Sequence, residues 1–272
     1  MSDGRALARE FLAQQRLLGG DSVILPDGAT PGTPGSRPGS VGPVASAALT
    51  PGASPGKTET RSAQTDSALP PPGLSFDPPG GDLFSNDPVP QAGSLEAIAQ
   101  LVARCTKCRL CEGRRHTVPG EGAADARLVV VGEGPGRVED ETGRPFVGPA
   151  GELLTKILGA IELPRERVFI CNVVKCRPPE NRLPQFDEIA ACVPYLFRQI
   201  DIVKPTVILA MGGTAAQTLL NTKQSLGALR NLVHRFRGIP LIVTYHPAAL
   251  LRNPNWKKPT WDDVRIARRL IG

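Results

Sequence analysis

The stretch "LVVVGEGPGRVEDETGRPFVG", Leu128 to Gly148, joins a short apolar run to a loop with five glycines, four acidic residues and one phenylalanine. A run of four residues rich in valine is typical of a buried strand. A glycine-rich turn after a strand often binds phosphate, but carboxylates repel phosphate. We therefore expect the loop to bind a ligand that requires close approach of the backbone and tolerates negative charge.

Three further apolar runs have the length and the β-branched content of buried strands, and segments of helical periodicity lie between them. The predicted strands are 128–131, 168–174, 206–211 and 241–244, and the predicted helices are 95–103, 149–161, 185–203, 213–220 and 262–270. This alternation predicts an α/β fold, a single domain with a central four-stranded parallel sheet and helices on both faces. Because such sheets bind ligands at the carboxyl ends of their strands, the loops "GEGPG", "CNVVKCRPPEN", "GGT" and "YHP" should converge on one cleft.

The N-terminal third of the chain differs in composition from the remainder. Positions 26–90 contain 14 prolines and 10 glycines. A segment with so few large apolar residues cannot bury enough surface to offset the entropy lost on ordering. We expect residues 1–94 to form a disordered tail, with a possible short helix at 3–18, and residues 95–272 to form the folded domain.

Charge divides at the same boundary. The net charge is −3 for residues 1–94 and +9 for residues 95–272. A basic domain favours a polyanionic partner such as a nucleic acid, although a merely basic surface would have the same net charge. No apolar run approaches the roughly 18 residues of a membrane span, and no signal peptide is evident. We expect a cytoplasmic, nucleoid-associated monomer with no membrane partner.

The cysteines suggest a metal centre. They are Cys105, Cys108, Cys111, Cys171, Cys176 and Cys192. In a reducing compartment such residues are ligands, catalytic groups or small buried side chains before they are disulfides. The C-x2-C pair in "CTKCRLC" can direct two thiolates to one site, and four thiolates could hold either tetrahedral zinc or an iron–sulfur cluster. Buried, unligated cysteines are the alternative.

Four blocks taken together are specific enough to indicate a family. In chain order, "CTKCRLCEGR", "GEGPGRVEDETGRPFVG", "NVVKCRPPENRLP" and "YHPAALLRNP" closely resemble the family 4 uracil-DNA glycosylases, which are bacterial and archaeal iron–sulfur enzymes. The resemblance covers about Cys105 to the C-terminus. It implies an enzyme that flips uracil out of double- or single-stranded DNA and hydrolyses its N-glycosidic bond, which initiates base excision repair. It also implies a structural [4Fe–4S] cluster held by Cys105, Cys108, Cys176 and Cys192.

Roles in uracil binding follow from the resemblance and from the chemistry of the base. Phe146 would stack on the flipped uracil, and Asn172 would hydrogen-bond its O4 and N3–H, which cytosine cannot match. Glu139 would lie near uracil C5, where bulk excludes the methyl group of thymine. Gly134 would let the backbone approach the base closely. The alternatives are a core position for Phe146 and a capping role for Asn172.

Catalysis requires groups that stabilise an anionic uracil and a cationic sugar. His246 in "YHP" would donate a hydrogen bond to O2 of the leaving uracil. Glu133 would orient the attacking water or stabilise the sugar cation, and Asn181 would help to hold the water or the abasic sugar. Better-known glycosylase families have an aspartate where this chain has Gly134, so the identity of the general base is left open. A ligand of this kind is compatible with the acidic loop.

Contacts to DNA and to other proteins are expected at two further segments. Leu250 or Leu251 would enter the vacated base stack, and Arg252 would meet phosphate, unless the leucines are buried at a helix start. The tail segment "GGDLFSND", 80–87, loosely resembles sliding-clamp-binding peptides, so a clamp or another repair or replication protein is a candidate partner.

Two other functions compete with a glycosylase. One is a relative that captures uracil-DNA covalently, but the basic, histidine-bearing loop of such proteins has no equivalent in "RPPENRLPQFDEIAAC". The other is a non-catalytic zinc or iron–sulfur DNA-binding module, against which the complete set of cleft motifs argues.

Overall fold

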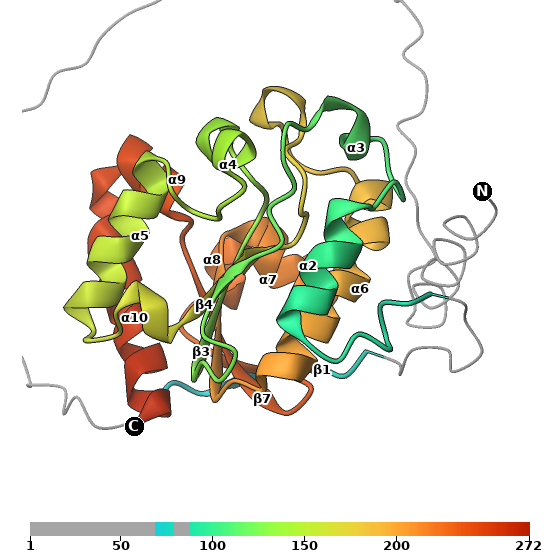
Figure 1. Ribbon diagram of the computed structural model, residues 1–272. Coiled ribbons are helices and arrows are strands. Elements are labelled where there is room, and N and C mark those ends of the chain that lie inside the picture. The colour runs from blue at the N-terminus through green and yellow to red at the C-terminus, as the bar shows by residue number, and fades with distance from the viewer. Residues whose placement is uncertain (1–68, 79–86) are drawn as a thin grey trace, which may run out of the picture. The chain divides into compact units, whose positions relative to one another are not determined.

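A seven-stranded sheet runs through the centre of the computed structural model, which describes residues 69–78 and 87–272 (Figure 1). In sheet order the strands are β1 (Pro72–Phe76), β6 (Val233–Phe236), β7 (Ile239–Thr244), β5 (Val207–Met211), β3 (Leu128–Gly132), β4 (Phe169–Asn172) and β2 (Glu121–Gly122). The four neighbours β7, β5, β3 and β4 are parallel. Their carboxyl ends therefore meet at one edge of the sheet.

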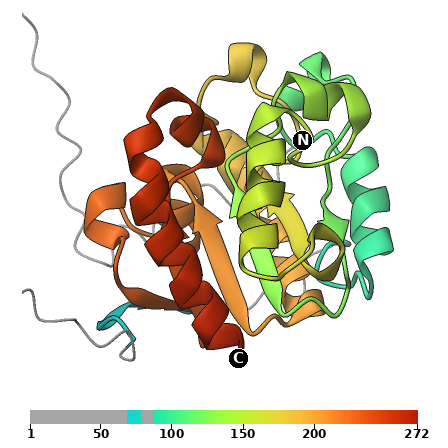
Figure 2. The same ribbon diagram turned by 90° about the vertical axis from the view of Figure 1, so that its left-hand side faces the viewer.

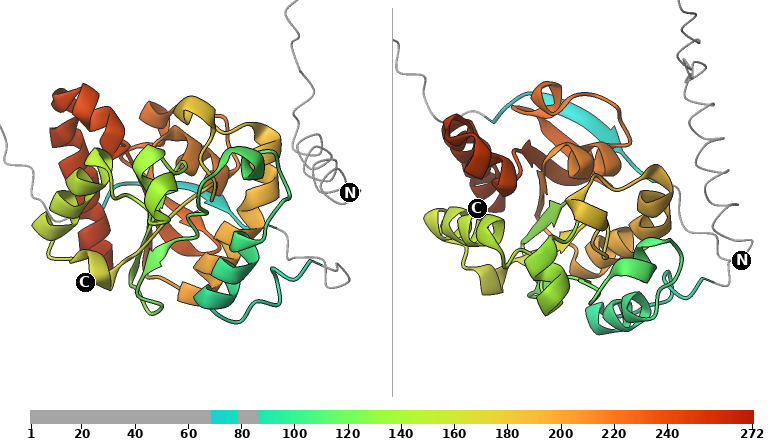
Figure 3. Two further views of the ribbon diagram at one scale, coloured as in Figure 1. Left: turned by 45° about the horizontal axis from the view of Figure 1, so that its top comes forward. Right: turned by 90° about the horizontal axis from the view of Figure 1, so that it is seen from above.

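Helices cover both faces of this sheet (Figures 2 and 3). Alternate residues of β3 point to opposite faces, so Val129 and Val131 belong to one core and Leu128 and Val130 to the other. The first core includes residues of α2 (Leu95–Ala103), α6 (Phe186–Val203) and α7 (Gly213–Leu220), and the second includes residues of α5 (Pro149–Ala160) and α10 (Lys257–Ile271). Burial on both faces explains why the central strands are continuously apolar.

Shorter helices complete the connections. They are α3 (Leu110–Gly113), α4 (Arg137–Thr142), α8 (Leu226–Leu229), α9 (Pro247–Arg252) and the 3₁₀ turns η1 (Arg165–Arg167), η2 (Pro179–Asn181) and η3 (Pro254–Trp256). Helix α4 follows β3 and α9 follows β7, so both begin at the edge where the strand ends meet. Within the described residues, no helix is both long enough and apolar enough to cross a membrane.

The predicted central architecture is confirmed, and the sheet is wider than expected. The four predicted strands are the parallel centre, and the five predicted helices are present. The expectation of only four strands is wrong, because β6 pairs antiparallel with β7, β1 pairs with β6, and the two-residue β2 pairs with β4. These edge strands are short or only partly buried, so they carry a weak apolar signal.

Part of the segment predicted to be tail contributes to this fold. Strand β1 extends the sheet, and Val89 and Ala92 are buried in the core that contains α2. The domain boundary at residue 95 stays a prediction, and these contacts favour a start nearer to residue 69. The possible helix at 3–18 and nearly all of the clamp-like segment 80–87 lie outside the described residues.

Candidate active site

The uracil-binding residues predicted from the sequence meet at the paired ends of β3 and β4. Gly132 ends β3 and lies opposite Asn172, which ends β4. A Cβ atom on Gly132 would lie 2.4 Å from Asn172 Oδ1 and 2.4 Å from Phe146 Cζ. Glycine is therefore needed here because any side chain would separate the amide of Asn172 from the ring of Phe146.

The amide of Asn172 has an unused hydrogen-bond acceptor. The residue is 1% exposed, and its Oδ1 is buried without a partner among the described residues. A buried acceptor left without a donor costs about 1–3 kcal/mol, and native proteins rarely retain one without a reason. A ligand that presents an N–H group at this position would satisfy the atom.

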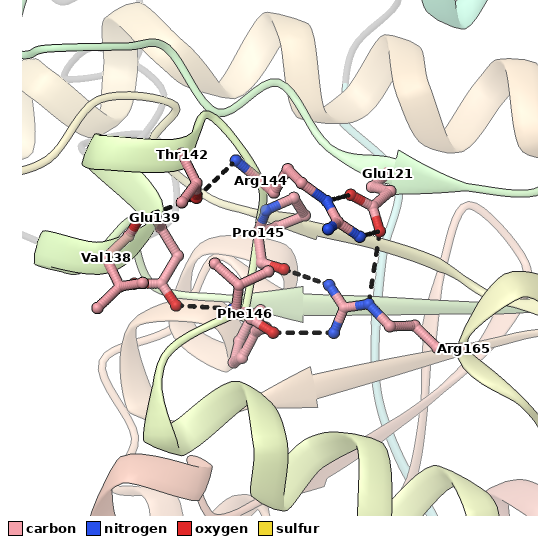
Figure 4. A network of polar contacts seen from close by, with 9 residues as sticks. Glu121, Val138, Glu139, Thr142, Arg144, Pro145, Phe146 and Arg165 are labelled. Carbon is pink, nitrogen blue, oxygen red and sulfur yellow. Dashed lines mark hydrogen bonds and ion pairs between the residues drawn. The ribbon is translucent and has the colours of Figure 1, made fainter.

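Phe146 is held in a left-handed backbone conformation by a network of polar contacts (Figure 4). Its φ is 51°, which is unfavourable for a residue with a bulky side chain. Arg165 donates from Nη1 to the Phe146 carbonyl at 2.9 Å and from Nη2 to the Pro145 carbonyl, while Glu121 accepts from Arg165 and Arg144. The ring is 4% exposed and its centroid lies 5.4 Å from that of His246. The network thus places Phe146 beside both Asn172 and His246.

Glu139 stabilises the same loop through hydrogen bonds to its backbone. Its Oε1 accepts the backbone N–H groups of Val147 and Gly148, each at 2.9 Å. The side chain is buried, so this carboxylate stabilises the turn that follows Phe146. Its predicted position near uracil C5 stays a prediction.

His246 lies at the junction of β7 and α9, where it is the N-cap residue. Its Nδ1 accepts the backbone N–H of Ala248 at 3.2 Å, so in the neutral ring the proton is on Nε2. Burial, assisted by the positive charge of Arg252 and opposed by the negative charge of Glu139, lowers the pKa of His246 to about 4. At neutral pH the side chain is therefore an uncharged imidazole whose Nε2–H is available as a donor.

Glu133 belongs to the loop after β3 and contacts the loop after β5. Thr214, in the first turn of α7, donates from Oγ1 to Glu133 Oε2 at 2.6 Å. The neighbouring Gly134 packs against the segment after β4, because a Cβ atom there would lie 2.8 Å from Val174 Cγ2. An aspartate at position 134, as in better-known glycosylase families, would therefore fit only if Val174 moved. The carboxylate that this turn does contain, Glu133, is partly buried.

Most of the remaining predicted residues lie on the surface, and the two leucines of α9 differ in their exposure. Asn181 is exposed in η2, where its Oδ1 accepts from Arg177 Nε at 2.8 Å. Leu250 is 1% exposed, whereas Leu251 is 50% exposed and Arg252 is exposed at the end of α9. Of the two leucines considered for contact with DNA, Leu251 is the one on the surface, because successive residues of a helix point in different directions.

All four predicted cluster ligands line one cavity between α2, the segment after β4, and α6. The cavity is lined by Cys105, Cys108, Cys111, Cys176 and Cys192 together with Val102, Lys107, Arg114, Lys175, Ala191 and Tyr195. Arg114 Nη1 donates to Cys176 Sγ at 3.2 Å, and the Lys175 backbone N–H donates to Cys192 Sγ at 3.2 Å. Cys111 thus joins the cavity, whereas Cys171 is buried in the core within β4.

The environment of these thiols is relevant to metal binding. Burial raises the pKa of Cys108 to about 11 and that of Cys192 to about 12, so thiolates form there only with a cationic partner. No group of three or more possible ligands among the described residues is arranged to hold a single metal ion. A four-iron cluster binds each thiolate through a different iron atom, so it suits a wider set of sulfurs than one zinc ion does.

Several residues of the site were not predicted from the sequence. Thr214 belongs to the "GGT" loop that was expected at the cleft, but its contact with Glu133, 81 positions away, was not foreseen. Arg165 contacts Phe146, 19 positions away, and no local pattern indicated it. Lys175 lies inside the motif "NVVKCRPP" and is fully buried. The sequence offered one indication of this buried position, namely that the lysine follows an apolar strand directly.

Comparisons with known proteins agree with this geometry. The profile of the uracil DNA glycosylase superfamily matches residues 119–266. A type-4 uracil-DNA glycosylase of Thermotoga maritima is 49% identical over 181 residues, covering 65% of this chain and 94% of the relative. A type-4 uracil-DNA glycosylase of Sulfurisphaera tokodaii is 46% identical over 186 residues, covering 65% and 84%. A type-5 uracil-DNA glycosylase of Pyrobaculum aerophilum is 30% identical over 150 residues, covering 49% and 66%.

Proposed function

The chain belongs to the uracil-DNA glycosylase superfamily, and within it to the type-4 enzymes, and from this premise we propose how it acts on DNA. It flips uracil out of the base stack and hydrolyses the bond between uracil N1 and the deoxyribose C1′. The products are free uracil and an abasic site, which is the starting point of base excision repair.

The unpartnered Oδ1 of Asn172 is the observation that carries this proposal. Uracil presents an N3–H donor beside its O4 acceptor, so one amide can accept from N3–H and donate to O4. Cytosine has an unprotonated N3 and an amino group, and its insertion would leave both groups of the amide mismatched. Phe146, held next to this amide, offers an aromatic surface for the flipped base.

The charges that develop during the reaction match the remaining side chains. As the N1–C1′ bond breaks, its electron pair leaves with uracil and the negative charge reaches O2. The neutral His246 donates from Nε2 to that oxygen, a hydrogen bond that strengthens as the charge grows. Glu133, fixed by Thr214, orients the attacking water and stabilises the cationic sugar, and Asn181 helps to hold the water or the abasic sugar.

We further propose that Cys105, Cys108, Cys176 and Cys192 hold a [4Fe–4S] cluster. Their common cavity and the sulfur hydrogen bonds from Arg114 and Lys175 support this assignment. When bound, the cluster cross-links three segments of the chain by iron–thiolate bonds. One of these segments directly follows β4, which ends at Asn172, and the role that we propose for the cluster is structural.

The proposed partner is uracil-containing DNA, double- or single-stranded. Leu251 and Arg252 would contact it from α9, the leucine at the vacated stack and the arginine at phosphate. A cytoplasmic, nucleoid-associated location, a monomeric state and a clamp or repair partner for the tail stay predictions.

Release of free uracil is the direct test. The purified protein is incubated with matched oligonucleotides that contain one uracil, thymine or cytosine, in single- and double-stranded form. We expect free uracil and an alkali-sensitive abasic site from the uracil substrates only. A protein that contains iron, binds these oligonucleotides and releases no uracil would contradict the proposal and favour the binding-module alternative.

A further inference from the structure

Lys175 is a charged side chain in an unusual position. It follows the end of β4 by three residues and is 1% exposed, among the largest fully buried side chains of the described chain. Its Nζ donates to the backbone carbonyl of Asn172 at 2.7 Å and to Gln199 Oε1 at 2.6 Å. Gln199 is itself fixed, because its Nε2 donates to the Pro119 carbonyl at 2.7 Å.

The contact with Asn172 acts on the peptide unit that follows the uracil-reading residue. Lys175 holds the carbonyl of this unit, and Gly132 accepts its N–H, which belongs to Val173, at 2.9 Å. The peptide plane is therefore held at both of its polar groups. Since the Asn172 side chain is attached to this backbone, its orientation depends on the two hydrogen bonds that hold the peptide unit.

The other side of Lys175 faces the cysteines. Lys175 lines the cysteine cavity, and its backbone N–H donates to Cys192 Sγ. The next residue is Cys176, a proposed ligand. Lys175 thus lies between the two sites, in contact with Asn172 at one end and with the cavity at the other.

The ammonium group has neutral hydrogen-bond partners but no counter-charge in the described part of the protein. Both acceptors are amide oxygens, and no carboxylate of the described residues lies within ion-pair distance of the ammonium. A buried cation is costly unless an anion accompanies it. A [4Fe–4S] cluster held by four thiolates has a net negative charge and would supply that anion.

We propose that Lys175 couples the cluster to uracil recognition, as the counter-cation of the cluster and the positioning residue of Asn172. This inference rests on the proposed function. The cluster holds the ammonium in place electrostatically, and the ammonium holds the Asn172 peptide. Loss of the cluster charge should therefore weaken the recognition of uracil by Asn172. Because coupling between two sites is reciprocal, binding of uracil should in return stabilise the cluster.

The test compares Lys175→Met with a matched control, Lys107→Met. Lys107 also lines the cysteine cavity, but its ammonium pairs with Asp87 at 2.6 Å instead of reaching Asn172. Two quantities are measured in the iron-loaded proteins. The first is the binding preference for a duplex with 2′-fluoro-deoxyuridine, which resists cleavage, over the same duplex with thymine. The second is the rate at which a chelator removes iron, followed by absorbance.

We expect Lys175→Met to lose about tenfold or more of its uracil preference and to lose iron faster than wild type, as expected for removing a charged hydrogen bond. Lys107→Met should keep the uracil preference of wild type. Unchanged preference in Lys175→Met would overturn the inference. Loss of preference with an unchanged rate of iron loss would overturn the coupling, since Lys175 would then only support Asn172.

A measurement on wild type covers the case in which Lys175→Met does not fold. If the sites are coupled, the fluorinated uracil duplex should slow iron loss more than the thymine duplex does. Equal protection by the two duplexes would refute the inference. The same wild-type sample is assayed for uracil release and iron, so failure of the proposed function would be seen separately.

Discussion

Replacement of Asn172 by alanine should impair uracil recognition while leaving the free energy of unfolding almost unchanged. Most buried side chains stabilise the folded protein, and their truncation typically costs about 2–5 kcal/mol. Asn172 differs because its buried Oδ1 has no partner among the described residues. In the free enzyme the substitution removes an unsatisfied acceptor.

The expected magnitudes follow from this accounting. Removing the unsatisfied acceptor relieves about 1–3 kcal/mol of desolvation, which offsets the packing lost with the side chain. The free energy of unfolding should therefore change by less than about 1 kcal/mol. With DNA bound, the same substitution removes two hydrogen bonds to uracil, each contributing about 0.5–1.5 kcal/mol. A total of about 1–3 kcal/mol corresponds to a loss of roughly 5- to 150-fold in preference for uracil.

Two assays and one contrasting variant test this prediction. Denaturant unfolding of the iron-loaded protein gives the change in stability, and single-turnover excision in competition with thymine DNA gives the preference. Asn172→Asp has nearly the same shape but buries a carboxylate, so it should be less stable than Asn172→Ala. If Asn172→Ala lost more than about 3 kcal/mol of stability while its uracil preference persisted, Asn172 would be a structural capping residue and the reasoning would fail.

Three further predictions concern other parts of the protein. His246→Ala should slow single-turnover excision by about two to three orders of magnitude with little change in duplex affinity. Because the pKa of His246 is about 4, wild-type excision should show no inflection near the ordinary histidine pKa of 6.5. The stability that comes from burying the neutral ring should be complete above that pH and decline as pH falls toward 4, which unfolding curves at several pH values would show. Cys176→Ser should lose iron and stability while Cys111→Ser stays brown, and equal iron content in the two would contradict the ligand set. A protein that begins at Leu69 should excise uracil like the full chain, whereas one that begins at Leu95 should unfold more easily because it lacks β1; equal stability of the two would contradict a role for β1.

The centre of the fold was predictable because its signals are local. The four central strands are short runs of buried aliphatic residues, and each helix between them has an amphipathic period. The edge strands were not predictable in this way. Pro72–Phe76 follows a run of prolines and belongs to the sheet only through pairing with Val233–Phe236, about 160 positions further along the chain.

The candidate site was predictable as a set of residues but not as an arrangement. Strand-end motifs and the resemblance to a known family together selected Phe146, Asn172 and His246, which the structure brings together beside Gly132. The left-handed backbone of Phe146 could not be foreseen, because it depends on Arg165 from a different segment. The choice between Leu250 and Leu251 likewise required the orientation of α9 on the domain.

The four acidic residues of the opening stretch make different contacts in the structure. Glu139 binds backbone N–H groups of its own loop, Asp140 accepts from the backbone N–H of Arg115, and Glu141 pairs with Arg137. These three carboxylates stabilise the loop, and the position of Glu139 near uracil C5 stays a prediction. Glu133 differs, because the hydrogen bond from Thr214 holds it among the strand ends. Glu133 is therefore the carboxylate of this stretch that we propose acts on the attacking water or the cationic sugar.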